Sequence, residues 1–112
     1  MNASQQDDSL LRQVAGVAAA LGRILGLRQA GAADAARVEL EGAYALLLGQ
    51  RSDLLRAVDT ATAAALIDVP EAIRALADLV AEEAEQEPDP DRRAVLRRRA
   101  AALKTEARRR VR

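Results

Sequence analysis

The chain has 112 residues, and its 17 basic and 17 acidic side chains cancel to a formal net charge of zero. It contains no His and no Cys, which excludes an imidazole base near neutral pH, a thiol nucleophile, a disulfide and a thiolate zinc site. We therefore predict a protein that is not an enzyme and holds no cofactor or metal ion. The length is typical of one domain with a modest core.

The composition predicts an all-α fold. Ala supplies 27 residues, whereas Phe and Trp are absent and Tyr44 is the only aromatic residue. Ala, Leu and Arg are strong helix formers, and residues that favour strands are few. We expect residues 1–8 to be a disordered N-terminus and residues 9–112 to form a single helical domain. Residues 1–8 are polar and acidic, which does not fit a secretory signal, so we expect a cytoplasmic protein.

The first predicted helix begins after a cap at Asp8 or Ser9. It ends at Gly31, because glycine suits the left-handed turn that closes helices. Its apolar side chains form a stripe wide enough to contact two neighbouring helices. The members of this stripe are Leu10, Leu11, Val14, Val17, Ala18, Leu21, Ile24 and Leu25.

Four residues decide how this first helix is interpreted. Arg12 and Arg23 interrupt the apolar stretch, which favours a buried helix of a soluble protein over a membrane span. Gly22 and Gly26 lie four residues apart, a spacing that lets two helix backbones approach closely. We therefore expect another helix to pack against these glycines.

The second predicted helix runs from about Asp34, a cap-type residue, to Gly49. Its core positions are Ala36, Leu40, Ala43 and Leu47. The consecutive leucines 46–48 cannot all face one interior, which favours a second apolar contact. Two short helices are expected next, one after Ser52 and one after Asp59 or Thr60.

The last two predicted helices form a hairpin around a proline-containing turn. The first opens with a cap at Asp68 and Pro70 in an early position, and it ends before Pro88. The second restarts at Asp89–Pro90. The expected core faces of the two helices are Ile73, Leu76 or Ala77, Val80 and Ala84, and Leu96, Ala100, Leu103, Ala107 and Val111.

Charge is strongly divided around that turn. Ten basic side chains lie between Arg92 and Arg112, and the preceding residues 82–91 carry six acids and no base. The candidate interaction residues are two triplets of arginine on one helix, Arg97, Arg98, Arg99, Arg108, Arg109 and Arg110. Three interpretations are open: a structural face that neutralises the acidic helix, a contact for an acidic protein, and a contact for nucleic acid. The apolar strip of this helix and the lack of aromatic stacking residues favour the first.

One acidic group could in principle hold a hard cation. Asp78, Glu82 and Glu85 stack on one face of a helix, as carboxylate ligands of Mg²⁺ do. A second acidic cluster on a facing helix is needed, and Glu39 and Glu41 point apart. We therefore expect a solvated acidic face and no metal site.

The order of segments predicts two helical hairpins joined by short helices. Gly31, followed by Ala36, Leu40 and Ala43, resembles the turn and second helix of a tetratricopeptide repeat. The whole order is similar to that of small bacterial tetratricopeptide-like proteins of unassigned function. The segments that carry this likeness are residues 10–12, 23–27, 46–49 and 76–85. The resemblance implies a tetratricopeptide-like array and no catalytic residue.

We therefore predict a non-catalytic helical module for protein–protein interaction. Its first expected partner is its own copy, in a homodimer or small homo-oligomer, and an acidic protein or helical peptide comes next. The alternative is a nucleic-acid-binding protein that uses the Arg-rich last helix, although we expect no nucleic-acid ligand. No membrane contact is expected.

Overall fold

The computed structural model describes residues 3–111 of the chain, with side chains from residue 8 onward. Its elements are α1 (Ala3–Gln29), α2 (Ala33–Leu48), the 3-10 helix η1 (Gly49–Arg51), α3 (Ser52–Ala57), α4 (Thr60–Ile67), α5 (Pro70–Gln86) and α6 (Pro90–Arg110). Within this described part every regular element is a helix, which confirms the all-α prediction. The expected breaks near Gly31, between Gly49 and Ser52, at Asp68 and at residues 88–90 are also confirmed.

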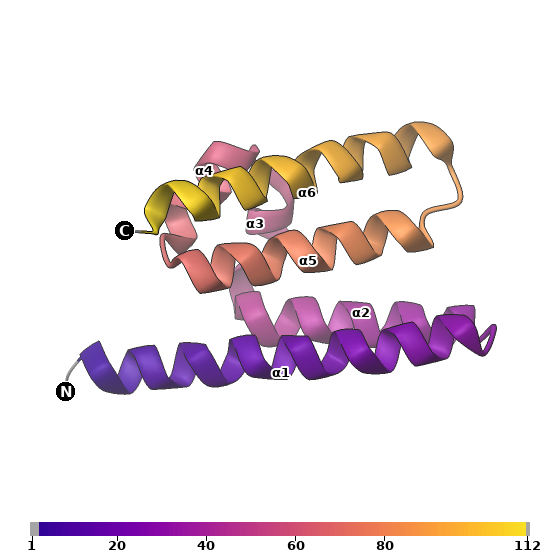
Figure 1. Cartoon of the computed structure of the whole chain (residues 1–112), viewed down its shortest axis with the longest axis horizontal. Helices are drawn as coiled ribbons and strands as arrows, with labels where there is room; N and C mark the ends of the chain where they lie inside the picture. Colours follow the sequence, from indigo (N-terminus) through magenta and orange to yellow (C-terminus); the bar gives the residue numbers. More distant parts are fainter. Residues whose placement is uncertain (1–2, 112) are drawn as a thin grey trace.

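The helices form two hairpins, and one helix of the second hairpin packs on the first (Figure 1). The α1–α2 pair is one hairpin and the α5–α6 pair is the other, as predicted. Helix α5 lies between them, because it packs on α1 and α2 as well as on α6. The short helices connect the hairpins, and α4 packs on α6.

Several helix ends differ from the sequence-based expectation. Helix α1 begins at Ala3, upstream of the expected cap at Asp8 or Ser9. Ala32, rather than Asp34, precedes α2, and no side chain caps that end. The expected disorder of residues 1–8 stays a prediction, and Met1 and Asn2 lie outside the described residues.

Asp68 closes α4 instead of capping α5. It adopts a left-handed conformation with φ of 64°, and its N–H donates to the carbonyl of Ala64 at 2.8 Å. The reason is the short connection: Val69 precedes Pro70 and is extended, so Asp68 alone can reverse the chain. The other acidic cap is confirmed, since Asp89 accepts from the N–H of Arg92 at 3.3 Å.

The core confirms the predicted faces of α2 and α5. Every position expected there is buried, and Tyr44 is buried with them. In α6, Ala100, Leu103 and Ala107 are buried, but Val111 is 61% exposed. The prediction for Val111 is wrong because α6 ends at Arg110, so the next residue leaves the helical register.

Helix α1 is covered along one flank only. Val17 and Ile24 are buried, whereas Leu11 and Leu25 are exposed. The expected packing against Gly22 and Gly26 is wrong, because a Cβ atom at either position would meet nothing within 4 Å. Helices α2 and α5 pack against the flank of α1 that carries Val17 and Ile24. The face that carries Leu11 and Leu25 therefore stays open.

Candidate interaction site

The six candidate arginines of α6 do not share one environment. Arg99 donates to the main-chain oxygens of Val58 and Leu55, at 2.7 and 2.9 Å, and so binds the end of α3. Arg110 pairs with Glu106 of the same helix at 2.8 Å and with Asp68, which follows α4, at 3.4 Å. These two arginines therefore fasten α6 and its neighbours.

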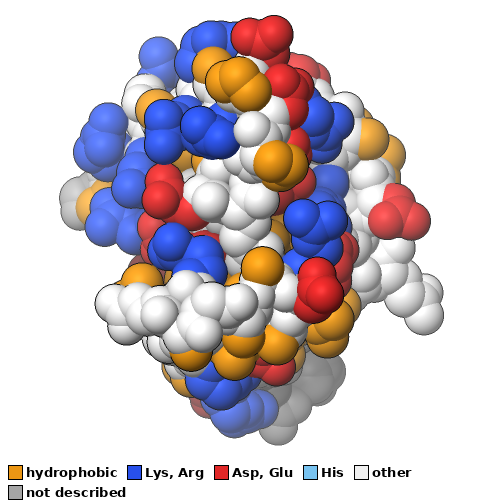
Figure 2. All heavy atoms as spheres, turned by 90° about the vertical axis from the view of Figure 1, so that its right-hand side faces the viewer, with side chains coloured by type: hydrophobic (Ala, Val, Ile, Leu, Met, Phe, Trp, Pro, Cys, Tyr) orange, Lys and Arg blue, Asp and Glu red, His pale blue; other side chains and the backbone are white. Residues whose placement is uncertain are grey.

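The other four candidates face solvent. Arg97 lies 3.4 Å from Glu85 across the hairpin, and Arg109 lies 3.5 Å from Glu106. Arg98 and Arg108 are exposed. From the end of the molecule that carries the α5–α6 turn, basic and acidic side chains are interleaved (Figure 2). Arg97 and Arg109 thus share their surroundings with the carboxylates of Glu85 and Glu106.

The acidic run of α5 is shared between both hairpins. Arg97 pairs with Glu85, and Arg92 lies 3.1 Å from Glu87, so part of the run does meet the basic helix. Glu82, which is only 8% exposed, instead meets Arg28 of α1. Arg28 Nε lies 2.8 Å from Glu82 Oε2, and Arg28 Nη2 donates to Glu82 Oε1 at 3.2 Å.

Tyr44 joins α2 to α3 and α5 through a network that the sequence did not reveal. Its hydroxyl donates to Glu83 Oε1 at 2.6 Å, and the guanidinium carbon of Arg56 lies 3.8 Å from the centre of its ring. Arg56 also donates to both carboxylate oxygens of Glu41, at 2.7 and 3.2 Å. Burial, followed by the hydrogen bond to Glu83, raises the pKa of the Tyr44 hydroxyl far above its ordinary value.

Asp78, Glu82 and Glu85, the carboxylates considered as cation ligands, do not converge on one point. Glu82 and Glu85 both approach Arg28, at 2.8 and 4.0 Å. Asp78 lies apart, on the wall of the groove described next. Among the residues that the structure describes, no three acidic side chains gather closely enough to share an ion.

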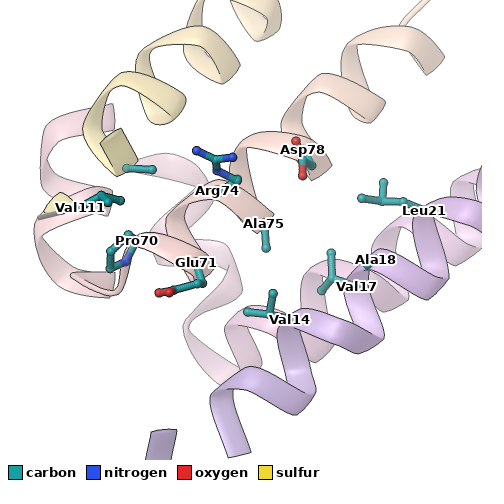
Figure 3. A pocket seen from close by; sticks show the side chains of 11 residues that line it. Val14, Val17, Ala18, Leu21, Pro70, Glu71, Arg74, Ala75, Asp78 and Val111 are labelled. Atoms are coloured by element: carbon teal, nitrogen blue, oxygen red, sulfur yellow. The ribbon is translucent and has the colours of Figure 1, made fainter. Parts of the chain in front are cut away.

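A groove of about 360 Å³ opens between α1, the first turns of α5 and the end of α6 (Figure 3). Its floor and walls are mostly apolar, and Glu71, Arg74 and Asp78 of α5 lie along them. The apolar lining residues are Val14, Val17, Ala18, Leu21, Pro70, Ala75, Ala107 and Val111. Concave, mostly apolar surfaces with a few charged groups are typical of binding sites.

Ala18, which lines the groove, also belongs to the open face of α1. Leu11 is 49% exposed and Leu25 is 46% exposed, and Ala18 lies between them. Exposed apolar side chains beside such a groove make this side of α1 a candidate contact surface. By length and composition alone, Asp8–Gln29 would suffice to cross a membrane, as the core helices of some soluble proteins also would.

No protein-family model, no curated protein and no solved structure matches this chain. What the structure establishes is a small all-helical protein with two packed hairpins. The resemblance to bacterial tetratricopeptide-like proteins remains an expectation from the sequence.

Proposed function

We propose that this chain is a non-catalytic helical module that binds other helices and first of all associates with its own copy. The observation that carries this proposal is the exposure of Leu11 and Leu25 beside the apolar groove. Complete burial of a leucine side chain is worth about 1.5–3 kcal/mol, so covering this face would stabilise a complex. The absence of His and Cys from the sequence supports a role without catalysis.

We further propose that the hairpins stack as a short tetratricopeptide-like array. The position of α5 against both helices of the first hairpin supports this, because neighbouring units of such arrays bury each other's apolar faces. In an array α1 would be the outer helix of the first unit. Terminal units need their outer face covered, and α1 has an apolar outer face. We place this activity in the cytoplasm and away from membranes.

Light scattering across a concentration series tests self-association. We expect the wild type to form a dimer at tens of micromolar and Leu25→Glu to be monomeric, because a carboxylate would have to be buried in the contact. Leu66→Glu on α4 is the matched control, since Leu66 is 47% exposed and lies on a different helix. The proposal would be contradicted if the wild type stayed monomeric at every concentration. It would also be contradicted if Leu66→Glu weakened the dimer as much as Leu25→Glu.

The exposed arginines favour a second candidate function. Arg97, Arg98, Arg108 and Arg109 all face solvent on α6 and could contact phosphates. This surface is shared with Glu85 and Glu106, which lowers its attraction for a polyanion. Nucleic-acid binding therefore ranks below protein association.

A further inference from the structure

We infer that the dimer forms by antiparallel pairing of α1 with α1 of a second copy, with Ala18 at the two-fold axis. This inference rests on the proposed self-association and specifies its geometry. Leu11, Ala18 and Leu25 are each seven residues apart, so they form one line along the helix. All three are exposed.

The pattern of this line is symmetric about its middle. If a copy of α1 runs in the opposite direction with Ala18 beside its own counterpart, Leu11 stands opposite Leu25 of the second copy. The reverse contact follows from the symmetry, because each patch in a two-fold dimer contacts the same patch on the other subunit. Both large exposed side chains of α1 are then buried by one operation.

The groove extends this contact. Val14 and Leu21 lie on its wall, and each is three residues from one member of the line and four from the next. Together with Leu11, Ala18 and Leu25 they give alternating spacings of three and four, which is the seam that pairs two helices in a coiled coil. A second α1 laid on this seam would cover the α1 side of the groove.

The centre of the seam allows close approach. Ala18 is small, and a Cβ atom at neighbouring Gly22 would meet nothing within 4 Å. The packing of the single chain therefore makes no use of this glycine, although a glycine inside an exposed helix costs about 1 kcal/mol relative to alanine. In a dimer the absence of a side chain at Gly22 would let the two α1 backbones approach closely.

Charge favours the antiparallel direction. The amino-terminal end of α1 is the positive end of its helix dipole, and its carboxyl-terminal end is the negative end. In the register centred on Ala18, the amino-terminal end of one copy lies beside the carboxyl-terminal end of the other. Parallel pairing would place like ends and like helix dipoles together.

Disulfide cross-linking tests this geometry, and the chain is suited to it because it has no native cysteine. Two cysteines can join only when their Cβ atoms lie within about 3.5–4.5 Å. We expect Ala18→Cys to form a covalent dimer under mild oxidation. Leu66→Cys on α4, a similarly exposed position, is the control and should remain monomeric.

A mixing experiment determines the direction of the helices. Leu11→Cys and Leu25→Cys chains with tags of different size are combined before oxidation. Antiparallel pairing predicts several-fold more mixed dimer than either variant forms alone. Parallel pairing predicts the reverse, with Leu11→Cys and Leu25→Cys each linking to itself, and this result would overturn the inference.

Light scattering of the reduced proteins separates this inference from the proposal on which it rests. If the wild type and reduced Ala18→Cys are dimers but Ala18→Cys links no better than Leu66→Cys, another surface forms the dimer. The inference then fails while self-association stands. If the wild type is monomeric and binds neutral phosphatidylcholine vesicles, both the self-association and the antiparallel dimer are contradicted. The apolar face of α1 would then bind a lipid bilayer. If Leu11→Cys or Leu25→Cys is monomeric under reducing conditions, that loss supports the seam as the dimer contact. The cross-linking of Ala18→Cys then tests whether the two-fold axis passes through Ala18.

Discussion

Tyr44 illustrates how a single buried residue connects three elements. It lies on α2, its hydroxyl donates to Glu83 of α5, and Arg56 of α3 covers its ring. Arg99 acts similarly between α6 and the end of α3 through two main-chain oxygens. Each of these side chains makes hydrogen bonds to groups of another element, and a typical bond of this kind contributes about 0.5–1.5 kcal/mol to stability.

The titration of Tyr44 should differ from that of an exposed tyrosine. Its pKa is raised in the folded chain, so the fold favours the neutral hydroxyl. The contribution of Tyr44 to stability is therefore complete below the unfolded pKa of about 10, and it falls as the pH rises above that value. With one Tyr and no Trp in the chain, ultraviolet absorbance follows this residue alone. We expect the phenolate signal to appear only when the chain unfolds.

Tyr44→Phe is the control for that titration. It keeps the ring under Arg56 and removes the hydrogen bond to Glu83. We expect it to lower the free energy of unfolding by about 1–2 kcal/mol near neutral pH. It should also lessen the loss of stability above about pH 10. A phenolate signal from the native protein at the ordinary pKa would contradict the buried position of Tyr44.

At the scale of the element, α6 combines an apolar strip with an unusually basic surface. Leu103 is fully buried in the centre of the strip, and Ala100 and Ala107 are buried beside it. Ion pairs on the surface of α6 involve exposed side chains, such as Arg97 with Glu85. Exposed pairs contribute about 0–1 kcal/mol, so packing dominates the stability of this helix.

Leu103→Asp should therefore destabilise the protein more than removal of surface arginines. We expect it to lower the free energy of unfolding by about 3–5 kcal/mol, because it deletes core contacts and buries a carboxylate. The double change of Arg97 and Arg98 to Gln should cost less than about 1 kcal/mol. Arg99 is left in place because it binds the end of α3. Urea unfolding measures the loss of unfolding free energy in both variants. An equal loss in the two would contradict an architectural role for α6.

At the scale of the whole molecule, opposite charges are distributed so that they meet. The two hairpins bring the acidic run of α5 against Arg28 of α1 and against Arg92 and Arg97 of α6. The division of charge along the sequence is therefore partly neutralised in the folded protein. Leu11 and Leu25 of α1 stay exposed beside the groove, as Val38, Leu54 and Val95 do on other helices.

This neutralisation predicts weak affinity for nucleic acid. Polyanion binding depends on the number of phosphates that basic residues neutralise, and it weakens steeply with salt. We expect fluorescence anisotropy to detect no tight binding of duplex or single-stranded oligonucleotides at physiological salt. Changing Arg98, Arg108 and Arg109 to Gln should then alter little. Tight binding by the wild type, with a steep salt dependence that these changes reduce, would make α6 a functional surface.

Local sequence patterns determined the helices and most of the core. Gly31 and Pro90 mark helix ends because their backbone preferences act within a few residues, wherever the helices finally pack. The core faces of α2 and α5 follow from the helical period in the same way. The capping error at Asp68 arose because two helices compete for one short connection, and the sequence does not show which of them a shared residue will serve.

Tertiary structure alone decided which side chains meet and which surface stays open. Arg28 and Glu82 are far apart in the chain and become partners only when α5 packs on α1. Gly22 was expected inside a helix contact, yet it faces solvent because α2 and α5 cover other sides of α1. The apolar period of a helix shows how wide its face is, but neighbouring helices decide how much of that face they cover. The open face of α1, on which the proposed function rests, could therefore be found only in the folded chain.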